Sequence, residues 1–252
     1  MLAGLLVAVA CGDGQTPGAV RMFDGLSLNG WEGDTALWRV VDGAIVGGTL
    51  KRPVTQSAYL CTRAEFADFE LRVSARINGP NAGVHFRSQR VPGSNQVAGY
   101  QADIGFAPGR IIAMLSDTVP ASLEQPYPLW GSLADEFRPE PDRYPDPAQP
   151  VRFIALAPSE LVKRVLRPDD WNEIAVVAVG PRIRLQLNGV TTVDFTEKGK
   201  VPTGGKVCLQ IHDGPPAEAW YKSISIRQIA VSQPSSSLGI PEQAAADADP
   251  KR

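Results

Sequence analysis

The stretch Asn81-Ala-Gly-Val-His-Phe-Arg87 predicts a strand whose two sides differ in chemistry. Because side chains alternate along a strand, Val84 and Phe86 point to one face while His85 and Arg87 point to the other. The first face can pack against a second sheet. The second face carries an imidazole and a guanidinium group, so the stretch predicts a β-sandwich with a polar binding face.

Two further segments, residues 99–104 and 207–213, repeat this alternation of polar and apolar side chains. We expect the three strands to lie in one sheet and to share one polar face. Six residues are predicted to gather on a concave face of that sheet: His85, Arg87, Gln101, Asp103, Gln210 and His212.

The composition of the chain predicts one large sandwich domain. Its 252 residues are 43% hydrophobic and 21% charged, which is enough apolar material for a single sizeable core. A net charge of -2, with no block of Lys or Arg, argues against a nucleic-acid partner. The domain is expected over residues 20–231, followed by a disordered tail over 232–252 that is poor in bulky side chains.

The first 19 residues are predicted to be a signal segment and a short linker. An apolar run, too short to span a bilayer, ends at Cys11 and is similar to the tail of a bacterial lipoprotein signal without its basic start. Cys11 would then carry the lipid, and the protein would be exported to the periplasm or anchored in the outer membrane. The alternative is an uncleaved apolar N-terminus. Cys61 and Cys208 remain, and the sequence leaves open whether they pair or are two buried small hydrophobes.

The rest of the chain reads as an all-β protein with many turns. Asp42-Gly43 and Asn188-Gly189 lie between alternating apolar residues, as in β-hairpins. At most one short helix is expected, near residues 133–137. The long connection over residues 106–150 is rich in proline and aromatic side chains, and we expect it to fold over the polar face.

An ordered set of short motifs resembles the 3-keto-disaccharide hydrolase domain family across roughly residues 20–230. The motifs include Phe23-Asp-Gly-Leu-Ser-Leu-Asn-Gly-Trp31, Trp38-Arg-Val-Val-Asp-Gly43, the stretch over residues 81–88, Trp171-Asn-Glu173 and Leu209-Gln-Ile-His-Asp-Gly214. The resemblance implies a concanavalin A-like jelly-roll sandwich of two curved antiparallel sheets. It also implies an exported bacterial protein that acts on sugars oxidised at C3.

The chemistry of a 3-keto sugar gives roles to the residues of the polar face. No Glu-x-Asp-x-Glu spacing, which sandwich glucanases use for their carboxyl pair, occurs in the chain. A C3 ketone acidifies the C2 proton, so that a base, a cation for the enolate and a donor for the leaving oxygen suffice. We expect His85 or His212 to be the base and Arg87 the cation. Asp103 would orient a histidine, act itself, or form a salt bridge with Arg87.

Other residues are candidates for holding the sugar. Gln101 and Gln210 can bond sugar hydroxyls, while Tyr100 and Trp130 can stack on a pyranose, although isolated aromatics in sandwiches are more often core. A divalent ion held by His85, His212 and Asp103 is a further option, because imidazole and carboxylate suit transition metals.

Three functions remain open from the sequence. The first is an enzyme that cleaves 3-keto-glycosides by elimination and hydration, the second a non-catalytic carbohydrate-binding domain, and the third an ordinary glucanase. A clustered polar set in a pocket favours the first, an open groove lined by aromatics the second, and two facing carboxyls the third.

Overall fold

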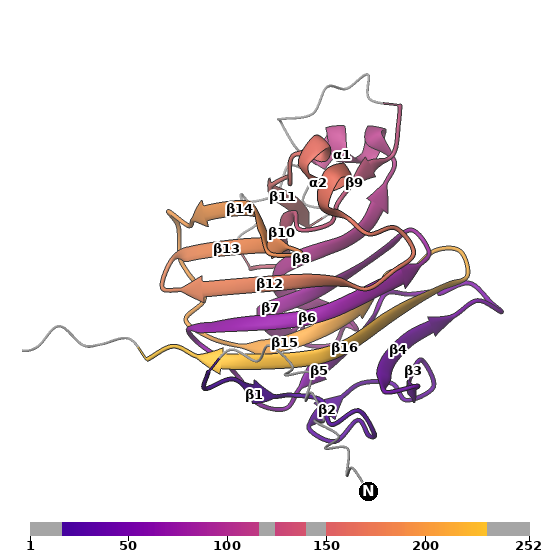
Figure 1. The fold of residues 1–252 in the computed structure, drawn as a ribbon, viewed down its shortest axis with the longest axis horizontal. Helices are drawn as coiled ribbons and strands as arrows, with labels where there is room; N and C mark the ends of the chain where they lie inside the picture. The colour runs from indigo at the N-terminus through magenta and orange to yellow at the C-terminus, as the bar shows by residue number, and fades with distance from the viewer. Residues whose placement is uncertain (1–16, 116–123, 140–149, 231–252) are drawn as a thin grey trace, which may run out of the picture.

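The computed structural model describes residues 17–115, 124–139 and 150–230, so both Cys11 and the predicted tail lie outside the described residues. The described chain forms two antiparallel sheets of eight strands each (Figure 1). The predicted sandwich of antiparallel sheets is therefore confirmed.

Sheet I is built around β6 (Phe69–Asn78) and β16 (Ala217–Gln228), which are its two longest strands. Its strands follow the order β14 (Val190–Thr196), β13 (Arg182–Leu187), β12 (Asn172–Val179), β6, β16, β4 (Ala44–Thr49) and β3 (Trp38–Val41), with β1 (Val20–Arg21) paired to β16.

Sheet II carries the three strands that were predicted to share a polar face, and they are neighbours. Its strands follow the order β11 (Val151–Ala155), β10 (Leu133–Glu136), β8 (Val97–Ala107), β7 (Asn81–Arg90), β15 (Lys206–Ile211), β5 (Ala58–Thr62) and β2 (Trp31–Glu32), with β9 (Tyr127–Pro128) paired to β8.

The core lies between the sheets and follows the predicted alternation. On β7, Val84 and Phe86 are fully buried in it, as are Ala102 and Ile104 on β8 and Leu209 on β15. A strand that buries alternate residues fixes its register, because a slip of one residue would exchange its apolar and polar faces. The polar residues of these strands therefore lie on the outer face of sheet II.

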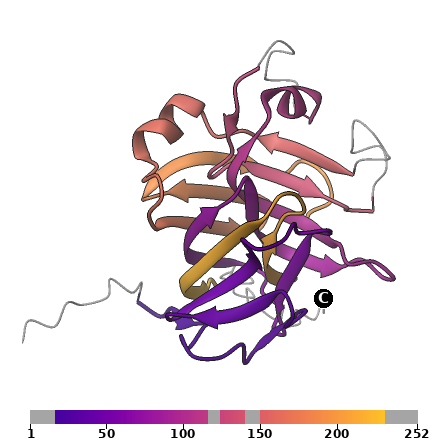
Figure 2. The same cartoon turned by 90° about the vertical axis from the view of Figure 1, so that its right-hand side faces the viewer.

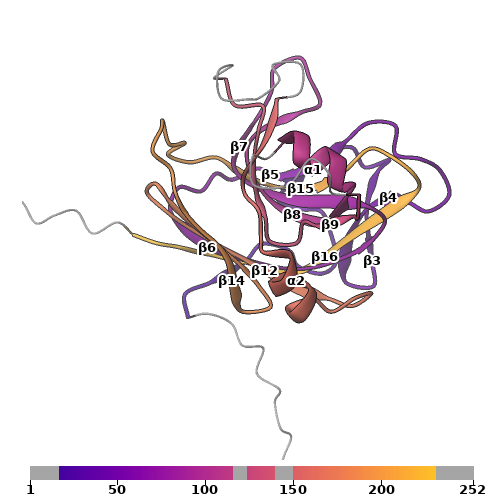
Figure 3. The same ribbon diagram turned by 90° about the horizontal axis from the view of Figure 1, so that it is seen from above.

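Two short helices lie at one end of the sandwich (Figure 2). Helix α1 (Gly109–Leu115) packs against β11 on the side of sheet II, and α2 (Ser159–Val165) packs against β9 and β14 (Figure 3). Neither helix was predicted, and the one helix that was expected, near residues 133–137, is wrong: Leu133–Glu136 is strand β10, paired with β8 and β11 on its two sides. In the described part of the chain, no helix is long and apolar enough to cross a membrane.

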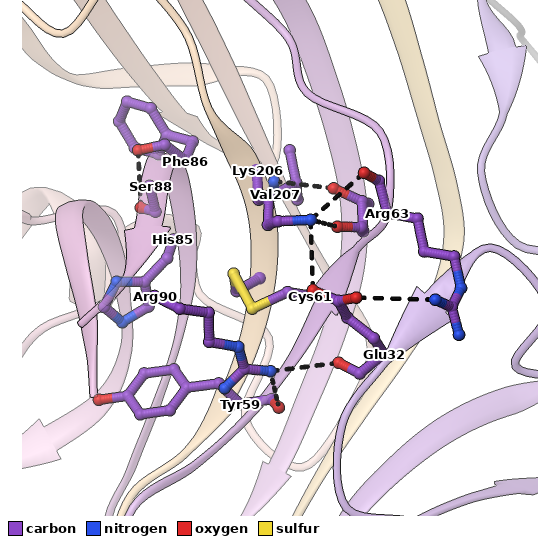
Figure 4. Close-up of a disulfide and its surroundings, with 12 residues drawn as sticks. Glu32, Tyr59, Cys61, Arg63, His85, Phe86, Ser88, Arg90, Lys206 and Val207 are labelled. Carbon is purple, nitrogen blue, oxygen red and sulfur yellow. Dashed lines mark hydrogen bonds and ion pairs between the residues drawn. A yellow bond between two sulfur atoms is a disulfide. The ribbon is translucent and has the colours of Figure 1, made fainter. Parts of the chain in front are cut away.

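Cys61 and Cys208 form a disulfide between β5 and β15, which settles the question that the sequence left open. The two residues face each other in the ladder of these strands. Both side chains lie on the outer face of sheet II, beside Tyr59 and Val97 and close to His85 (Figure 4). The bond therefore ties together two strands that carry the polar face.

Candidate functional site

A pocket of ≈ 770 Å³ lies on the outer face of sheet II, between the sheet and helix α1. Its lining includes four residues that the sequence placed on the polar face: Gln101, Asp103, Gln210 and His212. Residues of the segment after β8, including Ile111 and Ile112 of α1, close one side of it. The expectation that the connection over residues 106–150 folds over the polar face is confirmed for residues 106–115, whereas residues 133–136 form strand β10 within the sheet.

Asp103 is a fully buried carboxyl on β8, held by two amides. The side-chain amides of Gln101 and Asn81 donate to its Oδ1, at 2.9 Å and 3.3 Å. Gly83 faces Asp103 across the ladder, and its missing side chain leaves the space that Gln101 fills. Burial raises the pKa of Asp103 to about 7, against the opposing effect of the two amides. Asp103 is thus a carboxyl that ionises near neutral pH.

Glu136 is the residue of this site that the sequence analysis missed. It ends β10, lies opposite Gly99 of β8, and lines the same pocket as Asp103. Burial first, and then the negative charges of Asp103 and Asp135, raise the pKa of Glu136 to about 8. The site therefore holds two electrostatically linked carboxyls, of which Glu136 keeps its proton to higher pH.

His85 lies beneath the pocket and does not line it. Its ring is fully buried, edge-on to Tyr59 at 5.2 Å between ring centroids. Burial lowers its pKa to about 3, so the ring is neutral at physiological pH. Its Nε2 is 3.8 Å from Oε2 of Glu136, which is too long for a hydrogen bond. Since burial keeps both groups neutral, this contact is not an ion pair at neutral pH.

Several buried polar atoms of this face have no hydrogen-bond partner among the described residues. They are both ring nitrogens of His85, Oε1 of Gln101, Oδ2 of Asp103 and Oε1 of Gln210. The atoms of Gln101, Asp103 and Gln210 belong to residues that line the pocket. Buried polar atoms are normally satisfied, so these three mark a surface that is suited to a ligand with many hydroxyls.

The predicted place of Arg87 on this face is wrong. A bulge between Phe86 and Gln89 and a φ of 49° at Arg87 turn its side chain away from that of His85. The guanidinium donates to the carbonyls of Ala67 and Gly180 and to Asp68, at 2.9, 2.6 and 2.7 Å. Its salt bridge is thus with Asp68 and not with Asp103, and it serves to hold loops of sheet I.

The prediction that two aromatic residues stack on the sugar is also wrong. Tyr100 is fully buried between the sheets, stacked on Phe86 at 5.6 Å, and its hydroxyl donates to Glu197. Trp130 belongs to the hydrophobic core. Both side chains pack in the hydrophobic core, which is where isolated aromatics of β-sandwiches are more often found.

His212 reaches the pocket only at its rim. It follows the last residue of β15, is exposed, and its Nδ1 lies 2.8 Å from the carbonyl oxygen of Asp213. Within residues 17–115, 124–139 and 150–230, no three His, Cys, Asp or Glu side chains form a cluster that could hold a metal. The ligand set suggested by the sequence, His85, His212 and Asp103, is therefore not brought together.

The two packed antiparallel sheets form a sandwich of the lectin type, with the described strands arranged as in the concanavalin A-like jelly roll. The chain belongs to the family of the 3-keto-alpha-glucoside-1,2-lyase-like domain, whose sequence profile matches residues 18–227. The predicted family and fold are thereby confirmed. No curated protein matches the chain.

Solved structures of low sequence identity share the fold. A candidate glycosyl hydrolase from Parabacteroides distasonis is 18% identical with a TM-score of 0.58, over 84% of this chain and 94% of its own. The carbohydrate-binding module CBM66 from Bacillus subtilis is 15% identical with a TM-score of 0.51, over 79% and 96%. The exoplasmic domain of VIP36 is 12% identical with a TM-score of 0.54, over 86% and 90%.

Proposed function

We propose that this protein is an enzyme that cleaves 3-keto-glycosides by elimination at the pocket of sheet II, followed by hydration. The observation that carries the proposal is the pair of buried carboxyls, Asp103 and Glu136, in one pocket of a chain that belongs to the lyase-like family. Two carboxyls whose surroundings give them different protonation states at one pH can serve as base and acid.

Each carboxyl transfers one proton in this reaction. The Asp103 carboxylate removes the C2 proton, which the neighbouring ketone acidifies, and the electrons form a C1–C2 double bond as the C1–O bond breaks. Protonated Glu136 gives its proton to the leaving oxygen. The amides of Asn81 and Gln210 line the same pocket and can donate to the enolate oxygen, the role first expected of Arg87. Water then adds across the double bond to give the free 3-keto sugar.

Asp103 is a better base than His85. A general base works best when its pKa lies near the working pH, and that of Asp103 is about 7. The imidazole of His85 has a pKa of about 3 and does not line the pocket. This choice keeps one of the three roles that the sequence allowed Asp103, which was to act as the base itself.

The test is exchange of the C2 hydrogen with deuterated solvent during turnover of a 3-keto-glucoside. We expect exchange with the natural protein, and a loss of turnover of about 10² to 10⁴ in Asp103→Asn. The unoxidised glucoside should be inert, because its C2 proton is not acidic. Cleavage with the C2 hydrogen fully retained would contradict elimination.

An ordinary glycosidase is the second candidate, because two facing carboxyls are also its machinery. It would cleave the unoxidised glucoside and lose that activity in both Asp103→Asn and Glu136→Gln. The third candidate, a binding domain, is supported by the shared fold with CBM66, which is a carbohydrate-binding module. It would bind sugars without turning over any of them.

We also propose that the protein is exported and anchored by a lipid on Cys11. The disulfide between Cys61 and Cys208 supports export, because such bonds persist in oxidising compartments. Expressed with a complete signal in a Gram-negative host, the protein should fractionate with membranes and Cys11→Ser should move it to the soluble fraction. Equal fractionation of the two forms would remove the anchor.

A further inference from the structure

The pocket on sheet II has two sides of opposite chemistry. Its floor carries the amides and carboxyls of the sheet, including Asp103 and Glu136. Its wall is apolar and comes from the end of β8, from α1 and from β11, with Phe106, Ile111, Leu115, Val151 and Phe153. A hexopyranose carries hydroxyls around its whole rim and offers an apolar side chain only the C–H faces of its ring, so it matches the floor better than the wall.

The apolar side chains of the wall are not part of the core. Phe106 is 42% exposed and Ile111 is 39% exposed, although both are large hydrophobic residues. Large apolar side chains that stay exposed around a pocket with polar groups are typical of a ligand site. With ≈ 770 Å³, the pocket is also of the size that holds a drug-sized ligand and larger than one sugar ring needs.

We propose that the apolar wall is the subsite for the leaving group, and that this group is an apolar, aryl-type aglycone. The inference rests on the proposed function, which puts the sugar ring on the carboxyl floor. The group attached to C1 then extends from the floor into the rest of the pocket. An aromatic ring is flat and apolar, so it fills the space beside Phe106 and Ile111 and removes their surface from water.

A second sugar as leaving group would need a polar subsite, and the structure offers a different place for one. A neighbouring pocket of ≈ 460 Å³ shares Ser57 and Tyr59 with the first and is lined by Asp34, Arg52 and Arg90. The Arg90 guanidinium, however, already donates to the carbonyls of Tyr59 and Glu32, at 3.2 Å and 3.3 Å. Arg90 thus holds β7 to β5 and β2, which leaves Arg52 as the other guanidinium in the lining and favours the apolar wall over this pocket.

Binding of unoxidised glucosides tests the subsite without any reaction. Titration calorimetry would compare 4-nitrophenyl glucoside with methyl glucoside, for both anomers. We expect the aryl glucoside to bind roughly ten-fold more tightly, since its ring buries apolar surface on the wall. Ile111→Ser should remove most of that advantage. Met114→Ser is the matched control, because Met114 lies on the same helix, is 65% exposed and does not line the pocket.

Turnover separates this inference from the proposed function. A higher kcat/KM for an aryl 3-keto-glucoside than for a 3-keto-disaccharide, lost in Ile111→Ser and kept in Met114→Ser, supports both. Aryl binding that depends on Ile111, without turnover of any 3-keto-glycoside, supports the subsite and contradicts the proposed function. Preference for the disaccharide, weakened by Arg52→Ala and unchanged by Ile111→Ser, overturns the inference and leaves the proposed function standing.

Discussion

The side chains of Arg87 and Asp103 were expected to lie on the same face of sheet II, but because of a single bulge in β7 only Asp103 lies there. The bulge between Phe86 and Gln89 adds one residue to β7 relative to β8, and together with the φ of 49° at Arg87 it turns the guanidinium toward Asp68. A charged group that is 2% exposed costs much free energy unless it is paired. The three hydrogen bonds of Arg87 supply that pairing, and they define its role as structural.

Replacing Arg87 by alanine should therefore lower stability and leave the chemistry intact. We expect a loss of about 3 kcal/mol in the free energy of unfolding, because the partner carboxyl Asp68 loses its ion pair. The measurement is urea unfolding, with kcat determined on the folded fraction. An unchanged unfolding free energy together with a kcat reduced 100-fold would return Arg87 to the catalytic role that the sequence suggested.

At the scale of the strands, the site depends on Gly83, whose missing side chain leaves room for Gln101 of the neighbouring strand. A Cβ on Gly83 of β7 would lie 2.5 Å from the side-chain carbon Cδ of Gln101, which holds Asp103. A Cβ on Gly99 of β8 would meet both the side chain and the backbone of Ser88, with 2.8 Å to its Cα. The end of a flexible side chain can move aside, whereas backbone cannot, so the two glycines differ in what they protect.

Gly83→Ala should fold and lose activity, while Gly99→Ala should fold poorly. In the first variant Gln101 is displaced and its hydrogen bond to Asp103 is lost, which raises the pKa of Asp103 further. The rising limb of the kcat/KM profile should then move to higher pH. Thermal unfolding of both variants and the pH profile of the first provide the measurement. A profile identical to that of the natural protein would show that Gln101 does not tune Asp103.

The sequence predicted the elements whose signals are local and missed those that depend on tertiary contacts. The alternation in β7, β8 and β15 placed His85, Gln101, Asp103 and Gln210 on one outer face, because strand period and a buried sheet leave no other register. Strand β10 carries no such alternation, since all four of its residues are buried. Glu136 was consequently missed, and the only signal for it was an acidic pair inside the proline- and aromatic-rich connection.

For the whole molecule, the buried carboxyls make stability depend on pH in an unusual direction. Asp103 and Glu136 have folded-state pKa values of about 7 and about 8, above the ordinary 3.8 and 4.5. Their contribution to stability is therefore complete below about pH 4 and is lost as the pH rises through these values. His85, with a folded-state pKa of about 3, acts in the opposite direction, but only below its ordinary value of 6.5.

The window between pH 6.5 and 8.5 thus isolates the carboxyls, and we expect the protein to become less stable across it by about 1 to 3 kcal/mol. Asp103→Asn should flatten the decline, both by removing one titration and by lowering the pKa of Glu136, which the Asp103 charge raises. Urea unfolding at the two ends of the window measures it. Asp42→Asn, in an exposed Asp-Gly turn, is the control. A stability that rises with pH in this window would contradict the assigned protonation states.

The strand order of sheet II has a consequence for how the protein is made. Strand β15 lies between β7 and β5, although more than a hundred residues separate it from either in the chain. While the chain is still on the ribosome, β5 and β7 cannot be joined until residue 211 has emerged. A truncated product therefore has no Gln210, no disulfide across the face and no closed sheet beneath the pocket. Formation of the pocket therefore requires that the chain has been made at least as far as Ile211.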